Sequence, residues 1–146
     1  MILIVDSNIL ISALISPNSK LTQILAYPKL PARRISCHYL LAELFSHQPK
    51  IVKYAKRPTD SVTDDLLYYL KIIRLYDETM IATQHWREAD RLTSGVNSKD
   101  ISFVALAPQT GGYLWTGDKK LSVHLKKMGF SRVLNTSELY ELLEIG

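Results

Sequence analysis

The 146-residue sequence lacks the usual features of secreted and membrane proteins. Cys37 is the only cysteine, so no disulfide can form within the chain, and a reducing compartment is expected. No stretch approaches the roughly 20 apolar residues of a transmembrane helix. No basic leader with an apolar core opens the chain. We therefore expect a cytoplasmic protein without a membrane segment, in which Cys37 is a small core residue.

Repeats, low-complexity tracts and linker-like segments are also missing, and the 4 histidines show no metal-ligand spacing. What is present is an ordinary globular composition, with 47% apolar and 22% charged residues. This length fits one domain with a single core, spanning residues 1–146. The net charge of +4 permits an anionic partner but does not require one.

Short apolar runs alternate with segments of helical spacing. Strands are expected at 2–5, 33–37, 73–76, 113–116 and 132–134. Helices are expected at 9–15, 20–27, 38–48, 49–57, 61–69, 80–93, 101–107, 119–128 and 136–144. Pro108 should kink or end the helix that starts at residue 101. This alternation predicts an α/β fold, a three-layer α/β/α sandwich around a central parallel sheet.

Four acidic residues lie in apolar surroundings: Asp6, Glu43, Asp100 and Asp118. Asp6 and Asp118 each follow an expected strand, and ligands of open α/β sheets bind just beyond such strand ends. Asp100 precedes a helix whose N-terminus lies at the same edge of the sheet. Glu43 lies roughly 120° from the centre of the apolar stripe of its helix, so it can face a cleft beside the core. We expect the four acids to converge on one cleft.

Electrostatics indicates what such a cluster is for. Two like charges about 4 Å apart repel by roughly 4 kcal/mol at an effective dielectric constant of 20. Four carboxylates would therefore take up protons or separate unless a cation compensated them. Mg²⁺ and Mn²⁺ prefer oxygen ligands and keep waters for the substrate, and such an ion neutralises charge on a phosphoryl group. An acidic pocket within a basic protein is typical of a metal-dependent nuclease.

Each acid also has a structural alternative. Asp6 and Asp100 both suit the N-cap of a helix. Asp118 suits a turn after a glycine. Glu43 can pair with His47, four residues further along its helix. Any one of these alternatives is plausible alone, but four such coincidences together are much less expected.

Four basic residues are candidates for contacts with a nucleic-acid backbone: Lys119, Lys120, Arg33 and Arg34. The two lysines follow Asp118 directly, where they can neutralise a phosphate near a metal. The alternative is that all four are simply solvated, as basic residues at helix starts and on helix faces usually are.

Four motifs occur in a fixed order: Ile-Val-Asp6-Ser-Asn8, Glu43 within a helix, Lys99-Asp100-Ile-Ser-Phe-Val-Ala-Leu-Ala107, and Leu-Trp-Thr-Gly-Asp118-Lys-Lys-Leu121. With them the sequence resembles the PIN domain family over nearly its whole length, and within it the VapC-type toxin ribonucleases and their relatives. Pro108 departs from the uninterrupted helix that the family has here.

The resemblance implies a PIN-like parallel sheet and an endoribonuclease that hydrolyses RNA phosphodiester bonds. It implies that Mg²⁺ or Mn²⁺ is bound by the carboxylates Asp6, Glu43, Asp100 and Asp118. It also implies that Asn8 and Thr116 support the site as polar neighbours. The family further suggests a homodimer and a cognate antitoxin protein whose peptide covers the cleft.

Two other functions fit parts of the sequence. One is a catalytically silent PIN protein that binds RNA or a partner, although the presence of all four acids argues against it. The other is a phosphoacceptor signalling module, because Leu-Ile-Val-Asp6 resembles the start of a receiver domain. That class has adjacent acids after its first strand and a lone Asp near residues 50–57. Here Ser7 follows Asp6, and residues 49–57 contain no acid.

Overall fold

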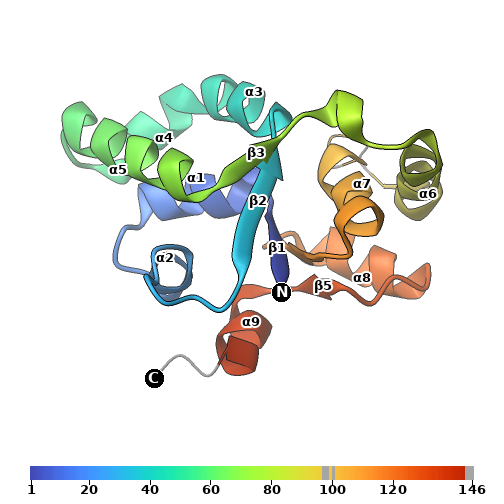
Figure 1. The fold of residues 1–146 in the computed structure, drawn as a ribbon. Coiled ribbons are helices and arrows are strands. Elements are labelled where there is room, and N and C mark those ends of the chain that lie inside the picture. Colours follow the sequence, from blue (N-terminus) through green and yellow to red (C-terminus); the bar gives the residue numbers. More distant parts are fainter. Residues whose placement is uncertain (97–98, 100, 144–146) are drawn as a thin grey trace.

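The computed structural model describes residues 1–96, 99 and 101–143. The described chain forms a five-stranded parallel sheet (Figure 1). Its strands are β1 (Ile2–Val5), β2 (Arg33–Cys37), β3 (Arg74–Tyr76), β4 (Tyr113–Trp115) and β5 (Val133–Leu134). The predicted parallel sheet is therefore confirmed, with each strand within two residues of its expected bounds.

The strand order is β3-β2-β1-β4-β5. The chain winds outward from β1 through β2 to β3 and then continues on the other side of β1 with β4 and β5. The order therefore reverses between β1 and β4, and ligands of open α/β sheets bind at such a switch point. Receiver domains have the order 2-1-3-4-5 instead, so the strand order argues against the phosphoacceptor hypothesis.

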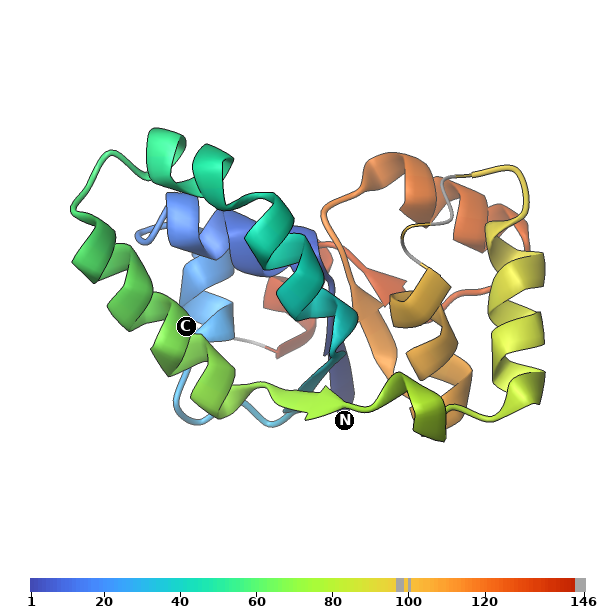
Figure 2. The ribbon, with the colours of Figure 1, turned by 90° about the horizontal axis from the view of Figure 1, so that it is seen from above.

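Helices cover both faces of the sheet, as the three-layer prediction requires (Figure 2). One layer consists of α1 (Ser7–Ile15), α2 (Lys20–Leu25), α3 (Tyr39–Ser46), α4 (Gln48–Ala55) and α5 (Thr59–Ile72). The other consists of α6 (Thr83–Thr93), α7 (Ile101–Thr110) and α8 (Lys119–Lys127). A short 3-10 helix, η1 (Glu78–Met80), connects β3 to α6, and α9 (Thr136–Leu143) packs against α2. In the described part of the chain, no helix is both long and apolar enough to span a bilayer.

The core lies on both sides of β1, whose residues Leu3, Ile4 and Val5 are fully buried. This burial explains the unbroken apolar run, because a central parallel strand is covered by helices on both faces. Each buried aliphatic side chain of this size stabilises the fold by about 1.5–3 kcal/mol. Cys37 is also buried, and burial raises the pKa of its thiol to about 12. The thiol stays protonated at neutral pH, so Cys37 is a core residue as expected.

Of the two outcomes predicted for Pro108, an early end of the helix is wrong, because α7 continues to Thr110. Proline lacks the N–H that would bond the carbonyl four residues earlier, so it normally weakens a helix. Here the segment 103–107 is buried against the sheet, and this packing outweighs the local preference. The Ala107 carbonyl accepts the backbone N–H of Gly111 at 2.8 Å and Nη2 of Arg132 at 3.4 Å, which satisfies the end of the helix.

Three helix starts differ from expectation by two residues or more, and one of them is that of α5, which begins at Thr59 rather than residue 61. α1 begins at Ser7 rather than Ile9, directly after Asp6. The helix expected over 80–93 is divided, because Ile81 and Ala82 have extended backbones between η1 and α6. The changes in α1 and in the segment 80–93 lie close after strands, where helix boundaries are hardest to predict from periodicity.

Candidate active site

Asp6 and Thr116 directly follow β1 and β4, the two strands that flank the switch point. Val5 pairs with Trp115, and the backbone N–H of Asp6 donates to the Trp115 carbonyl at 3.2 Å. Both side chains are buried, with 1% of Asp6 and 0% of Thr116 exposed. The Thr116 hydroxyl donates to Oδ2 of Asp6 at 2.6 Å. Strand pairing thus brings together two polar side chains that lie 110 residues apart in the sequence.

Asp118 belongs to the same cluster. Oγ1 of Thr116 accepts the backbone N–H of Asp118 at 3.1 Å, so this hydroxyl contacts both aspartates. Oδ1 of Asp118 caps α8 by accepting the backbone N–H of Leu121 at 3.0 Å. Asp118 therefore has a structural role as the cap of α8, but this role uses only its Oδ1 atom. Within the described ranges, Oδ2 of Asp118 has no hydrogen-bond partner in the protein and can serve as a ligand.

Asp6 is costly to ionise in this environment. Burial raises the pKa of Asp6 above its ordinary value, and the negative charge of Asp118 acts in the same direction. Hydrogen bonds from the hydroxyls of Thr116 and Ser7 partly oppose this rise in pKa. The backbone N–H of Asn8 also favours the charged form, but its geometry is not that of a capping hydrogen bond. Capping of α1 therefore does not explain why an acid occupies position 6.

Glu43 lies on α3, and its Oε2 is 3.2 Å from Nε2 of His47. The predicted pairing of these two residues is therefore confirmed, and the Glu43 side chain is only 13% exposed. Among the described residues, no hydrogen bond or ion pair connects Glu43 with Asp6 or Asp118. The structure brings Asp6 and Asp118 together but does not by itself bring Glu43 to them.

Asp100 lies outside the described residues, so the predicted four-acid cluster is represented by its other members. Within residues 1–96, 99 and 101–143, no three His, Cys, Asp or Glu side chains form a group that could hold a metal. The oxygen donors nearest one another on the described contacts belong to Asp6 and Asp118: the Thr116 hydroxyl donates to the carboxylate of Asp6 and accepts the backbone N–H of Asp118. This donor set fits Mg²⁺, which proteins usually bind through one or two carboxylates while the ion keeps several waters.

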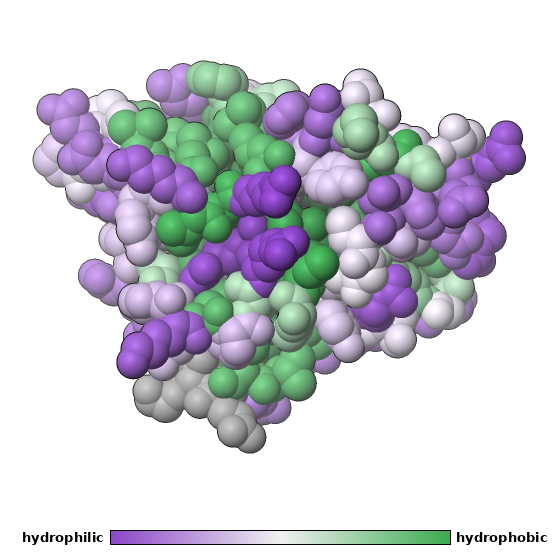
Figure 3. All heavy atoms as spheres, in the orientation of Figure 1, coloured by the Kyte–Doolittle hydropathy of each residue, from purple (hydrophilic) through white to green (hydrophobic). Residues whose placement is uncertain are grey.

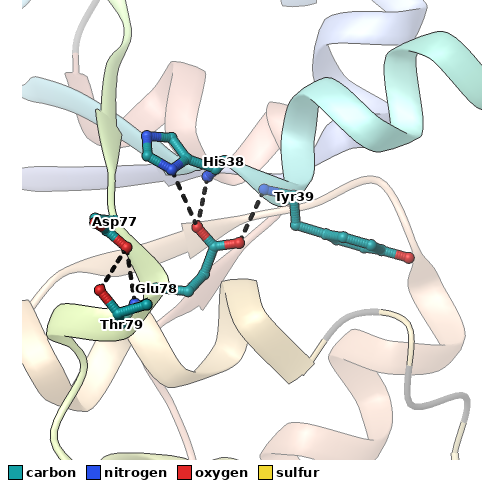
Figure 4. Close-up of polar contacts among 5 residues, drawn as sticks. All are labelled: His38, Tyr39, Asp77, Glu78 and Thr79. Carbon is teal, nitrogen blue, oxygen red and sulfur yellow. Dashed lines mark hydrogen bonds and ion pairs between the residues drawn. The ribbon is translucent and has the colours of Figure 1, made fainter.

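Sequence reasoning missed Glu78, which fixes the start of α3 (Figure 4). Its two carboxylate oxygens accept the backbone N–H groups of His38 at 2.8 Å and Tyr39 at 3.0 Å. A carboxylate is favoured at a helix N-terminus, where the N–H groups and the helix dipole present positive charge. Glu78 thereby positions the helix that carries Glu43. No local pattern could reveal this cap, because 40 residues separate Glu78 from His38.

Tyr39 extends from the start of α3 on the side away from Asp77 (Figure 4). Its ring packs against Phe103 of α7, with ring centroids 6.0 Å apart and planes inclined by 52°. This contact joins α3 to the helix that follows Asp100. Asp77 in turn caps η1 by accepting the N–H and the hydroxyl of Thr79 at 2.9 and 2.8 Å. The Tyr39–Phe103 contact thus packs α3, the helix that carries Glu43, against α7.

The two arginines predicted to contact a nucleic-acid backbone, Arg33 and Arg34, lie in different surroundings. Adjacent residues of a strand point to opposite faces of the sheet, so Arg33 and Arg34 diverge on β2. Nη2 of Arg34 donates to the Tyr27 carbonyl at 2.6 Å, and burial lowers the pKa of this arginine. Arg33 is exposed. Both residues lie at the amino end of β2, on the opposite edge of the sheet from Asp6.

The remaining sequence candidates lie at the carboxyl edge. Asn8 is exposed on the first turn of α1, two residues after Asp6. Lys119 and Lys120 are exposed at the start of α8. They differ in direction, because Lys119 lines a pocket beside Thr116 and Lys120 does not.

Comparison with known proteins assigns the family. The PIN domain matches residues 4–137 of the chain. The fold is similar to a chain in the crystal structure of VapBC2 from Rickettsia felis bound to a DNA fragment from their promoter, with a TM-score of 0.69. That match has 16% sequence identity and covers 92% of this chain and 98% of the other. No curated protein sequence matches the chain. The match over residues 4–137, with the parallel fold that the two structures share, shows that the chain belongs to the PIN domain family.

Proposed function

We propose that the protein is a metal-dependent endoribonuclease of the cytoplasm and the toxin of a toxin–antitoxin pair. The observation that carries this proposal is the buried Asp6 beside Asp118 at the switch point. A buried carboxylate with a second negative charge nearby is destabilising unless a cation compensates both. The arrangement is therefore best explained by a divalent cation that the two carboxylates bind.

The donor set supports Mg²⁺ or Mn²⁺ as that cation, because both ions prefer oxygen ligands. Asp6 and Asp118 would bind the ion, and Glu43 and Asp100 complete the proposed set of carboxylates. When bound, the ion would activate a water and neutralise charge on the phosphoryl group of the RNA.

The chain's own residues prepare the carboxylates for this task. The Thr116 hydroxyl fixes the direction of Asp6, and the capping bond to Leu121 fixes one oxygen of Asp118. Burial raises the pKa of Asp6, and a bound cation would reduce the cost of ionising this carboxyl group. In this proposal, the side chain of Asn8 lines the same edge and orients water or substrate.

The test is cleavage of a panel of transfer and messenger RNAs during a Mn²⁺ titration. Asp118→Asn should reduce cleavage by about 100-fold or more, since it removes a proposed ligand. Asp90→Asn is the matched control, because Asp90 is an exposed acid on α6 and should leave activity unchanged. Metal-independent cleavage, or full activity of Asp118→Asn, would contradict the proposal. RNA binding without cleavage in Mn²⁺ would favour the catalytically silent alternative.

An antitoxin partner is the second element of the proposal, and an apolar hollow supports it. The hollow has a volume of roughly 150 Å³ and lies between α1, α3, α4 and α5, lined mainly by aliphatic side chains. Phe45 borders it with 75% of its surface exposed, and Val52 borders it with 41% exposed. Large exposed apolar residues around a hollow indicate a protein-binding surface. The similar fold in VapBC2 favours an antitoxin as the occupant.

This partner is tested with the product of a small gene adjacent to the coding sequence. Phe45→Asp should abolish its binding in native mass spectrometry. Leu67→Asp should not, because Leu67 is equally apolar and 54% exposed but does not border the hollow. Light scattering of the protein alone tests the predicted homodimer. Loss of dimerisation in Phe45→Asp would assign the hollow to a second copy instead.

A further inference from the structure

A polar pocket of roughly 390 Å³ adjoins the candidate active site. Its base is formed by Thr116 and Gly117, the two residues that precede Asp118. One wall is α8, and the other is formed by Asn135, which precedes α9, and Glu138 in its first turn. A volume of this size is typical of sites for small organic ligands. Neither Asp6 nor Asp118 lines the pocket, but Thr116, which contacts both aspartates, does, so the pocket and the candidate site share this residue.

The α8 wall presents one face of the helix to the pocket. Lys119, Ser122, Val123 and Lys126 line it, with the i, i+3, i+4 and i+7 spacing of a single helix face. Lys119 has no carboxylate partner within the described ranges. Lys126 pairs with Glu138 at 3.5 Å, but both side chains are more than 40% exposed, so the pair is weak. Two lysine ammonium groups therefore border a pocket next to an acidic centre.

The opposite wall carries the carboxylate of Glu138, and one of its two oxygens caps the start of α9. Oε1 of Glu138 accepts the backbone N–H of Asn135 at 3.0 Å, and Oε2 contacts Lys126. Oδ1 of Asn135 accepts the backbone N–H of Glu138 at 2.8 Å, which leaves the amide NH₂ of Asn135 as a hydrogen-bond donor. The polar groups that remain available in the pocket are thus mainly donors, which suit the oxygens of a phosphate or a base.

Gly117 is not explained by the needs of the fold. Its φ is not in the left-handed region, which among the described glycines is adopted by Gly95, Gly111 and Gly129. A Cβ atom at position 117 would meet no atom within 4 Å. Neither backbone conformation nor packing therefore requires glycine here. Its effect is to keep the base of the pocket free of a side chain and to expose the backbone to a bound group.

We propose that this pocket binds one nucleotide of the RNA strand, adjacent to the phosphodiester that is cleaved. Lys119 and Lys126 contact phosphate oxygens, and the sugar or base lies against the backbone of Gly117. This inference rests on the proposed ribonuclease function and specifies where its substrate extends from the metal-binding carboxylates. It also explains why α8 combines a capping aspartate with a lysine-rich face.

The first test measures binding of a fluorescent single-stranded oligoribonucleotide in EDTA, so that cleavage does not interfere. Lys126→Gln should raise the Kd about tenfold and reduce the salt slope by about one. Lys127→Gln is the matched control on the same helix outside the pocket and should change the Kd by less than about twofold. Lys119→Gln should weaken binding more than Lys120→Gln. If Lys126→Gln and Lys127→Gln lost equal RNA affinity, and Lys119→Gln and Lys120→Gln did too, RNA would be attracted to the charge of α8 in general. That result would overturn the proposal.

The second test obstructs the pocket without removing charge. Gly117→Ala and Gly117→Val should unfold at the wild-type temperature or above, and should weaken RNA binding progressively. Mn²⁺ affinity measured by electron paramagnetic resonance should stay unchanged, which separates obstruction from damage to the carboxylates. Wild-type RNA affinity in Gly117→Val would contradict the proposal.

The two proposals fail in different ways. A wild-type protein that binds RNA through Lys119 and Lys126 but does not cleave it in Mn²⁺ would retain the pocket and refute the nuclease. Metal-dependent cleavage with unaltered KM in Lys119→Gln and Lys126→Gln would retain the nuclease and refute the pocket.

Discussion

Replacing Thr116 with valine removes the hydroxyl that contacts both described aspartates of the site. The bond from this hydroxyl to Asp6 is 2.6 Å long and wholly buried. Hydrogen bonds to charged groups contribute about 1.5–3 kcal/mol, and a buried donor left without an acceptor costs about 1–3 kcal/mol. The second cost applies to the Asp118 N–H, which loses its acceptor. Thr116→Val should therefore lower the free energy of unfolding by roughly 2.5–6 kcal/mol.

The effect should depend on pH, because the Thr116 hydroxyl favours the charged form of Asp6. The folded pKa of Asp6 is already raised, so ionising Asp6 costs stability as pH increases from about 3.9, the ordinary pKa of aspartate, through the folded pKa. Thr116→Val raises the folded pKa further. The difference in the free energy of unfolding between the wild type and Thr116→Val should thus grow over this pH range. It should be smallest at low pH, where Asp6 is protonated in both the folded and the unfolded state.

Urea unfolding of the metal-free protein across pH 4–8 measures this difference, and Thr116→Ser is the control. Serine keeps the hydroxyl and loses one methyl group, which should cost only about 1 kcal/mol. A valine variant as stable as the serine variant at neutral pH would refute the reasoning. A difference that does not change with pH would show that the hydroxyl stabilises the turn rather than the charge of Asp6.

Three other perturbations test separate parts of the structure. Asp6→Asn should stabilise the metal-free protein at neutral pH, since it removes a charge that burial disfavours, and should abolish stabilisation by Mn²⁺ in thermal unfolding. Gly112→Ala should destabilise the protein by about 1–3 kcal/mol, because the new Cβ would lie 2.9 Å from Cγ2 of Ile2. Glu78→Gln should destabilise it by about 1–2 kcal/mol, because an amide replaces one of two acceptors at the start of α3. Faster amide hydrogen exchange at His38 would accompany this last change, and unaltered exchange would contradict it.

The sequence predicts the parts of this molecule whose cause is local. The run Ile2–Val5 is apolar at every position because both faces of β1 are covered, and this pattern is visible without a structure. The capping pair Asn135 and Glu138 likewise follows from a three-residue spacing, and its two hydrogen bonds are present. The meeting of Asp6 with Asp118 follows from one further rule, that parallel strands end at the same edge.

Features that depend on tertiary contacts could not be predicted in this way. Pro108 remains within a helix because the preceding turn is buried. Glu78 reaches α3 across 40 residues, which no periodicity describes. The divergence of Arg33 and Arg34 was predictable in principle, because neighbouring strand residues alternate in direction. Lys119 lines the pocket and Lys120 does not, and this difference depends on the orientation of α8 relative to its N-cap, Asp118.

The hydrogen bond between Asp6 and Thr116 has a consequence for protein synthesis. It joins two residues whose codons lie 110 positions apart in the message. Nascent chains that end before β4 contain Asp6 without the strand that places Thr116 and Asp118 beside it. For the proposed ribonuclease, the site can therefore assemble only after β4 has been synthesised, so a shorter nascent chain lacks the paired aspartates.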